Sequence, residues 1–229
     1  MNDYLSLFEQ KKLVLIMSLP RNDPALAAAA FETGADAVKV HINVDHRASG
    51  THFGRLEEER PALEDMLSRR RGPMGLVLGG SLEKAALDAE AAGKLPFSFH
   101  SLYAHHVPAG LVHSGTPLMA ACDGSYSMEE IRLMDEAVGA QVLEASVIPG
   151  GEYGQGLSMR DLIRYRMIAE QVKIPVVVPT QRLIRPADVG ALIQCGVRGL
   201  MIGAVVTGKE ADAISRAVAA FRRAIDGAV

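Results

Sequence analysis

At 229 residues the chain suits one α/β barrel, which typically needs about 250 residues, and no composition shift or linker divides it. A net charge of −3 gives no electrostatic case for nucleic-acid or membrane partners, and no apolar stretch approaches the roughly 20 residues of a membrane span. Cys122 and Cys195 have neither metal-site nor disulfide-scaffold spacing, and the N-terminus lacks a signal-peptide pattern. We therefore expect one cytoplasmic domain over residues 1–229, without a metal or cofactor.

The first half of the chain shows strands that alternate with helices. A short apolar run, Leu13–Ser18, is interpreted as the first strand. Asp23 and Pro24 then supply an N-cap and a first-turn proline for a helix over 25–33, which Gly34 ends. Three further apolar runs have strand length: Ala37–Ile42, Gly75–Leu78 and Phe97–Leu102.

The second half repeats this pattern of strand and capped helix. Ser127 and Glu130 form a capping box, Ser158 and Asp161 resemble one, and Pro186 opens a further helix. The strands predicted here are Leu118–Cys122, Gln141–Ser146, Val176–Pro179 and Gly199–Ile202.

Eight strands, each followed by a helix or helical turn, predict a single (β/α)8 TIM barrel. A doubly wound open sheet is the alternative, but it would want a glycine-rich turn after the first strand. The turn over 18–23 contains no glycine. In a barrel, functional side chains gather where the strands end, so those positions carry the functional prediction.

The second strand places polar side chains on one face. Alternation sets Lys39, His41 and Asn43 together, opposite three apolar residues that should face the helices. A buried lysine needs an anionic partner or ligand, because an unpaired buried charge is very costly. Lys39 is therefore either half of an internal pair with Glu144 or a catalytic or ligand-binding group.

Three other strand ends carry candidate acid or base groups. Glu144, on the sixth strand, is a natural general base beside a lysine or histidine. Asp123 is either a second acid/base group or part of an ordinary Asp-Gly turn. His100 shares a face with Ser98 and is either an inward catalytic group or a structural histidine.

Two long, glycine-punctuated loops, 43–54 and 149–156, are candidate lids over the barrel mouth, and Tyr153 could cover a ligand. The pairs Asp45-His46 and His105-His106 suggest a metal site. Neighbouring histidines on a strand point opposite ways, however, and no HExxH-type spacing occurs, so we predict no metal site.

The last two strand ends predict a phosphate site. Gly203 and Ala204 allow the backbone to approach an anion, and the preceding loop adds Thr180, Gln181 and Arg182. Loops seven and eight are the usual phosphate site in such barrels. The expected partner is a small phosphorylated metabolite.

The sequence resembles the ribulose-phosphate-binding barrel superfamily, most nearly its N-acetylmannosamine-6-phosphate 2-epimerases. The likeness covers most of the chain and rests on these segments: Ser18-Leu-Pro with Asp23-Pro24 and Gly34-Ala35, Ala37-Val-Lys39, Cys122-Asp-Gly-Ser-Tyr-Ser-Met-Glu-Glu130, Arg182-Leu183 with Pro186, and Gly203-Ala-Val-Val-Thr207.

The departures from that family concern its chemistry. The epimerases carry a catalytic lysine where the third strand ends, and this chain has Leu78-Gly79-Gly80. They carry a glutamate and a glycine before the arginine of the seventh loop, and this chain has Thr180-Gln181. The resemblance thus implies the fold and the phosphate site, and it does not imply the epimerisation mechanism.

We expect an isomerase, epimerase or lyase of carbohydrate metabolism that acts next to a carbonyl of a phosphorylated, sugar-like substrate. Glu144 or Asp123 would move the proton, and Lys39 with His41 would stabilise the enolate charge. The alternatives are a non-catalytic phosphometabolite-binding barrel or partner subunit, and a metal-dependent hydrolase or aldolase that uses the loop histidines. Because exposed barrel helices often pair, a homo-oligomer is expected.

Overall fold

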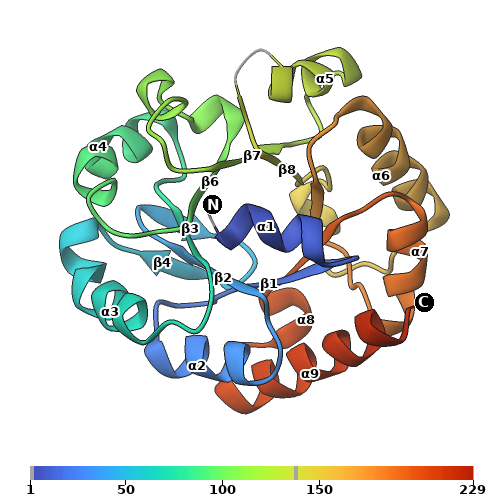
Figure 1. Ribbon diagram of the computed structural model, residues 1–229, viewed down its shortest axis with the longest axis horizontal. Helices are drawn as coiled ribbons and strands as arrows, with labels where there is room; N and C mark the ends of the chain where they lie inside the picture. The colour runs from blue at the N-terminus through green and yellow to red at the C-terminus, as the bar shows by residue number, and fades with distance from the viewer. Residues whose placement is uncertain (1–2, 137–138, 229) are drawn as a thin grey trace.

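The eight apolar runs form eight parallel strands that close into a barrel, which confirms the predicted (β/α)8 architecture (Figure 1). The computed structural model describes residues 3–136 and 139–228. Around the barrel the order is β1-β10-β9-β8-β7-β6-β5-β2, and β2 pairs with β1 to close it. The barrel strands are β1 Val14–Ser18, β2 Ala37–His41, β5 Met74–Val77, β6 Phe99–Tyr103, β7 Leu118–Cys122, β8 Val142–Ala145, β9 Val176–Pro179 and β10 Gly199–Ile202.

Helices surround the barrel, and three of them begin at the predicted caps Asp23, Ser127 and Ser158. Asp23 Oδ1 accepts a hydrogen bond from the N–H of Ala25 at 2.9 Å, and Ser158 and Asp161 form a complete capping box. Two short 3₁₀ turns, rather than an α-helix, connect β6 to β7. The helices of the ring are α2 Pro24–Glu32, α3 Leu56–Arg69, α4 Leu82–Ala92, α5 Met128–Glu136, α6 Met159–Gln171, α7 Val189–Gln194, α8 Ala204–Thr207 and α9 Ala211–Gly227.

A helix that precedes the first strand closes one end of the barrel. In Figure 1, α1 (Asp3–Gln10, dark blue) crosses the centre of the ring. Tyr4 is fully buried, stacks on Phe99 at a ring-centroid distance of 3.9 Å and meets Phe8 edge-on. A side chain on Gly75 would lie 2.1 Å from the Phe99 ring, so the glycine is what lets this ring fill the barrel. The opposite end, where the strands finish, therefore holds the accessible cavity.

The loop over 43–54, predicted as a candidate lid, contains a β-hairpin. Strands β3 Val44–His46 and β4 Thr51–Phe53 pair antiparallel and project from the end of β2. Across residues 3–136 and 139–228, no helix has the length and apolar character needed to cross a bilayer.

Candidate active site

A cavity of about 760 Å³ lies at the carboxyl ends of the barrel strands. All eight barrel strands contribute to its wall, as do the β3–β4 hairpin and the loop after β8. Its size falls within the range of small-molecule sites. The position agrees with the general rule that barrels place their chemistry at this end.

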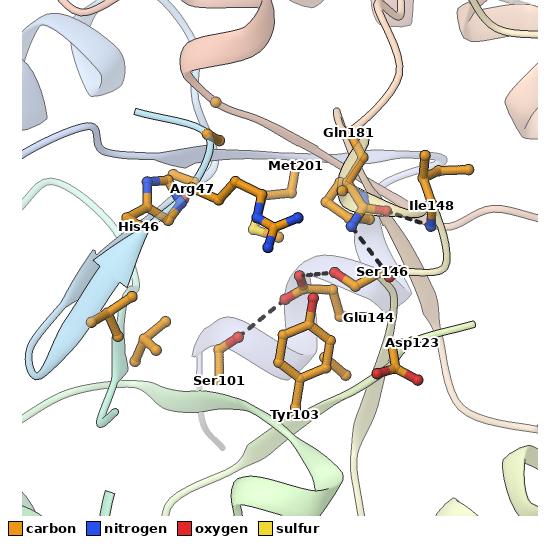
Figure 2. A pocket seen from close by; sticks show the side chains of 18 of the residues that line it. His46, Arg47, Ser101, Tyr103, Asp123, Glu144, Ser146, Ile148, Gln181 and Met201 are labelled. Carbon is orange, nitrogen blue, oxygen red and sulfur yellow. Dashed lines mark hydrogen bonds between the residues drawn. The ribbon is translucent and has the colours of Figure 1, made fainter. Parts of the chain in front are cut away.

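The floor of the cavity holds a lysine and a glutamate in contact. Lys39 Nζ lies 3.2 Å from Glu144 Oε2, and both side chains are more than nine-tenths buried. Ser101 Oγ donates to Glu144 Oε2 at 3.1 Å, and Ser146 Oγ donates to Oε1 at 2.8 Å (Figure 2). Three donors therefore fix the carboxylate, and the pair faces open space rather than a closed interior.

Tyr103 is a site residue that the sequence did not single out. It ends β6, and its phenol projects towards Glu144 in Figure 2. Burial raises the pKa of Tyr103, and the nearby carboxylate raises it further, so the hydroxyl is protonated and can donate a hydrogen bond. The missed signal was the alternation Phe99, Ser101, Tyr103, which the predicted end of the strand at Leu102 cut short.

The structure corrects the expectation for His100. Ser101 points inward to Glu144, and neighbouring residues on a strand face opposite sides, so His100 faces the helices. It is 2% exposed, and burial lowers its pKa to about 4. Ser98 shares that outward face, so the predicted grouping of these two residues holds. Of the two interpretations of His100, the structure fits the structural histidine and contradicts the inward catalytic group.

His41 lies on the cavity wall but packs beneath the hairpin. Its ring is 4.7 Å from that of His46 and 4.8 Å from that of Phe53, between centroids. Burial, His46 and Lys39 together hold the pKa of His41 well below its usual range. Burial and Lys39 lower the pKa of His46 to about 4. Both imidazoles are therefore neutral at pH 7. His46 Nδ1 lies 2.8 Å from Ser49 Oγ, whereas the buried Nδ1 of His41 has no hydrogen-bond partner among the described residues.

Asp123 lines the cavity and forms the ordinary turn that was one of its two interpretations. Its Oδ1 accepts from the N–H of Ser125 at 2.8 Å and from the Ser125 hydroxyl at 2.5 Å. These bonds outweigh burial and lower the pKa of Asp123. Asp123 therefore serves the turn, whereas Glu144 contacts Lys39 at the cavity floor and is the better-placed base.

At the ends of β9 and β10, several predicted contact residues line the same cavity. Thr180 Oγ1 accepts from the N–H of Gly203 at 3.0 Å, which joins the two strand ends. Gln181 Nε2 donates to the hydroxyl of Tyr153 at 2.6 Å, so these two side chains brace the loop after β8. Ala204 begins α8 and is not among the lining residues, although both of its neighbours are.

Arg182, the predicted phosphate ligand, lies outside the cavity. Its Nη2 is 3.1 Å from Asp161 Oδ1 and 2.6 Å from Glu152 Oε2, and its side chain is 10% exposed. Although burial opposes it, these bonds to Asp161 and Glu152 raise the pKa of Arg182. The expectation for Arg182 is corrected, since its charge holds the loop after β8 to α6.

Two other arginines do line the cavity, Arg47 in the hairpin and Arg164 on α6. Arg164 donates to the carbonyl oxygens of Val147 and Gly124 at 3.1 and 3.4 Å. Over the part of the chain that the structure describes, no three His, Cys, Asp or Glu side chains are arranged to hold a metal ion.

No protein-family model matches this chain, and no curated protein matches it either. Solved structures share its fold. A structure described as native KDPGal superposes with a TM-score of 0.68 and 20% identity, over 96% of this chain and 97% of that one. Thiamine phosphate pyrophosphorylase from Pyrococcus furiosus superposes with a TM-score of 0.64 and 18% identity, over 96% of this chain and 99% of that one. A mutant tryptophan synthase alpha-subunit from Pyrococcus furiosus superposes with a TM-score of 0.67 and 15% identity, over 91% of this chain and 97% of that one. At these identities the similarity establishes the TIM-barrel fold and no activity.

Proposed function

We propose that the protein is an enzyme that moves a proton at the carbon next to a carbonyl of a small phosphorylated, sugar-like substrate. The observation that carries the proposal is the Lys39–Glu144 pair at the floor of a cavity of about 760 Å³. A purely structural pair would need no ligand-sized space above it. Here two serine hydroxyls fix the Glu144 carboxylate, and the pair is open to that space, which is the preorganisation that acid/base catalysis requires.

The chemistry follows from the positions of the groups. Glu144 takes the proton from carbon, and the electron pair moves to the carbonyl oxygen to form an enolate. The Lys39 ammonium and the protonated Tyr103 hydroxyl stabilise the negative oxygen. If the proton returns to the other face of the same carbon, the product is an epimer. If it returns to the neighbouring carbon, the product is an isomer. If the bond next to the enolate is cleaved instead, the reaction is that of a lyase.

The phosphate is proposed to bind at the ends of β9 and β10, where Thr180 and Gly203 line the cavity. This is the usual phosphate position in such barrels. The resemblance to ribulose-phosphate-binding barrels supports it, as does the fold neighbour named thiamine phosphate pyrophosphorylase.

Deuterium exchange tests the proposal whichever product is formed. The protein is incubated in D₂O with ribulose 5-phosphate, fructose 6-phosphate, dihydroxyacetone phosphate and N-acetylmannosamine 6-phosphate, and loss of the C–H signal is followed by NMR. We expect exchange on at least one compound, reduced about 10²–10⁴-fold in Glu144→Gln. Glu90→Gln, on exposed α4, is the matched control. Binding of these compounds without exchange would instead indicate a non-catalytic phosphometabolite-binding barrel.

A Schiff base on Lys39 is the lyase variant of this proposal. Borohydride added in the presence of a carbonyl substrate would then attach that substrate to Lys39, and peptide mass spectrometry would locate it. Labelling of another lysine, or of none, would exclude the Schiff base on Lys39, and the enolate route would be the only one left.

A further inference from the structure

Arg47 is a cation in the cavity mouth with no partner among the described residues. It lies just after β3, and its guanidinium reaches over the pocket above Glu144 in Figure 2. Within residues 3–136 and 139–228, it makes no ion pair or hydrogen bond through its side chain. The other basic groups of the cavity wall, Lys39 and Arg164, are bound to protein oxygens.

The carboxylates of the cavity wall are already engaged elsewhere. Asp45 accepts from His52 at 2.7 Å and from a lysine of α4 at 3.2 Å. Asp123 is bound within its own turn, and Glu144 holds three donors. The charge of Arg47 is therefore left for something that enters the cavity.

The guanidinium of Arg47 lies against the opposite rim of the mouth. A Cβ on Gly150, in the loop after β8, would lie 1.4 Å from Arg47 Nη1. No residue with a side chain fits there while the arginine keeps its position. The absence of a side chain at 150 thus lets Arg47 extend from the hairpin to the far wall.

The base of the hairpin is fixed, so the arginine is delivered to a defined place. Asn43, which leads into β3, adopts a left-handed conformation with φ of 56°, and its Nδ2 donates to Asp88 Oδ2 at 2.9 Å. Arg55, just beyond β4, donates to Asp88 Oδ1 at 2.8 Å. One buried carboxylate therefore ties both ends of the hairpin to α4.

We propose that Arg47 binds a second anionic group of the substrate, either a carboxylate or a second phosphate, across the cavity from the phosphate at β9 and β10. The planar guanidinium fork matches both groups in a two-bond geometry. This proposal rests on the proposed function and narrows its substrate class to compounds with two anionic ends, such as a phosphorylated sugar acid or a sugar bisphosphate.

Two matched ligand pairs test the proposal by calorimetric titration. Glycerol 3-phosphate and 3-phosphoglycerate differ by a carboxylate, and ribulose 5-phosphate and ribulose 1,5-bisphosphate differ by a phosphate. The wild-type protein should bind the member with two anionic groups about tenfold to hundredfold more tightly in at least one pair, and that pair identifies the second group. Arg47→Met should abolish this preference and leave binding of the member with one anionic group unchanged.

Two further variants serve as controls for the binding experiment. Arg47→Lys keeps the charge without the fork and should keep only part of the preference. Arg60→Met removes an exposed arginine of α3 outside the cavity and should behave as wild type. Circular dichroism checks that each variant is folded.

Three results would overturn the proposal. The first is that the wild type binds both members of each pair equally, or binds none of them. The second is that the preference survives in Arg47→Met. The third is that this variant loses glycerol 3-phosphate binding. The last would show that Arg47 holds the phosphate itself. If one of these results is found but deuterium exchange still occurs, only the Arg47 proposal is wrong and the proposed function stands. If the preference depends on Arg47 but no deuterium exchange occurs, only the catalytic proposal is wrong.

Discussion

Replacing His100 by leucine should flatten the pH dependence of stability. His100 is buried on the outer face of β6, and burial lowers its pKa to about 4. In the unfolded chain its pKa returns to about 6.5. Between these values the unfolded state binds a proton that the folded state does not, so unfolding is favoured as the pH falls. The stability contribution is complete above pH 6.5 and is lost progressively towards pH 4.

The size of this effect follows from the two pKa values. Between pH 7 and pH 5, linkage predicts that His100 alone removes about 2 kcal/mol from the free energy of unfolding. Urea unfolding at pH 7, 6 and 5 should show this loss in the wild type, and His100→Leu should lack it. His41 and His46 titrate in both proteins, so the difference between the two curves isolates His100.

A second substitution separates titration from packing. His100→Gln is polar and His100→Leu is apolar, so their stabilities at pH 7 will differ, but both should lose the same pH-dependent part. Parallel curves for the wild type and both variants would refute the argument that His100 is buried and neutral.

Three further changes test the fold and the site by urea unfolding. Tyr4→Ala should cost about 3–5 kcal/mol, because the ring closes the barrel end, and a loss below about 1 kcal/mol would contradict that role. Lys39→Met and Glu144→Gln should each destabilise the protein, and the double variant should lose about 1–3 kcal/mol less than their sum, whereas simple additivity would deny the contact. Arg182→Met should cost about 3 kcal/mol by unpairing buried Asp161, yet leave glycerol 3-phosphate affinity unchanged; weaker affinity would restore its predicted phosphate role.

Local sequence pattern was sufficient for the architecture. Apolar runs of strand length, separated by capped helices, are recognised from neighbouring residues, and the closed barrel formed as predicted. The same alternation placed Lys39 on the inner face of β2 and Glu144 on the inner face of β8, because apolar partners on the other face left no ambiguity.

The sequence did not place His100 and Tyr103 of β6 correctly, and both cases have the same physical reason. Alternation says that His100 and Tyr103 face opposite sides, but both faces of β6 mix polar and apolar residues, so polarity does not say which side is inward. Packing decides it, because Gly75 leaves space for the Phe99 ring beneath Tyr4. The contacts that make this choice join residues far apart in the sequence.

The assignment of the arginines also depended on tertiary structure. Arg182 and Arg47 are both loop arginines in the sequence, and nothing local distinguishes them. Folding brings Asp161 to the first, while the hairpin carries the second across the mouth to Gly150. The sequence by itself determined the barrel and the lysine and glutamate inside it. Tertiary structure alone decided which cation is left to meet a ligand, because charge pairing is settled by neighbours in space.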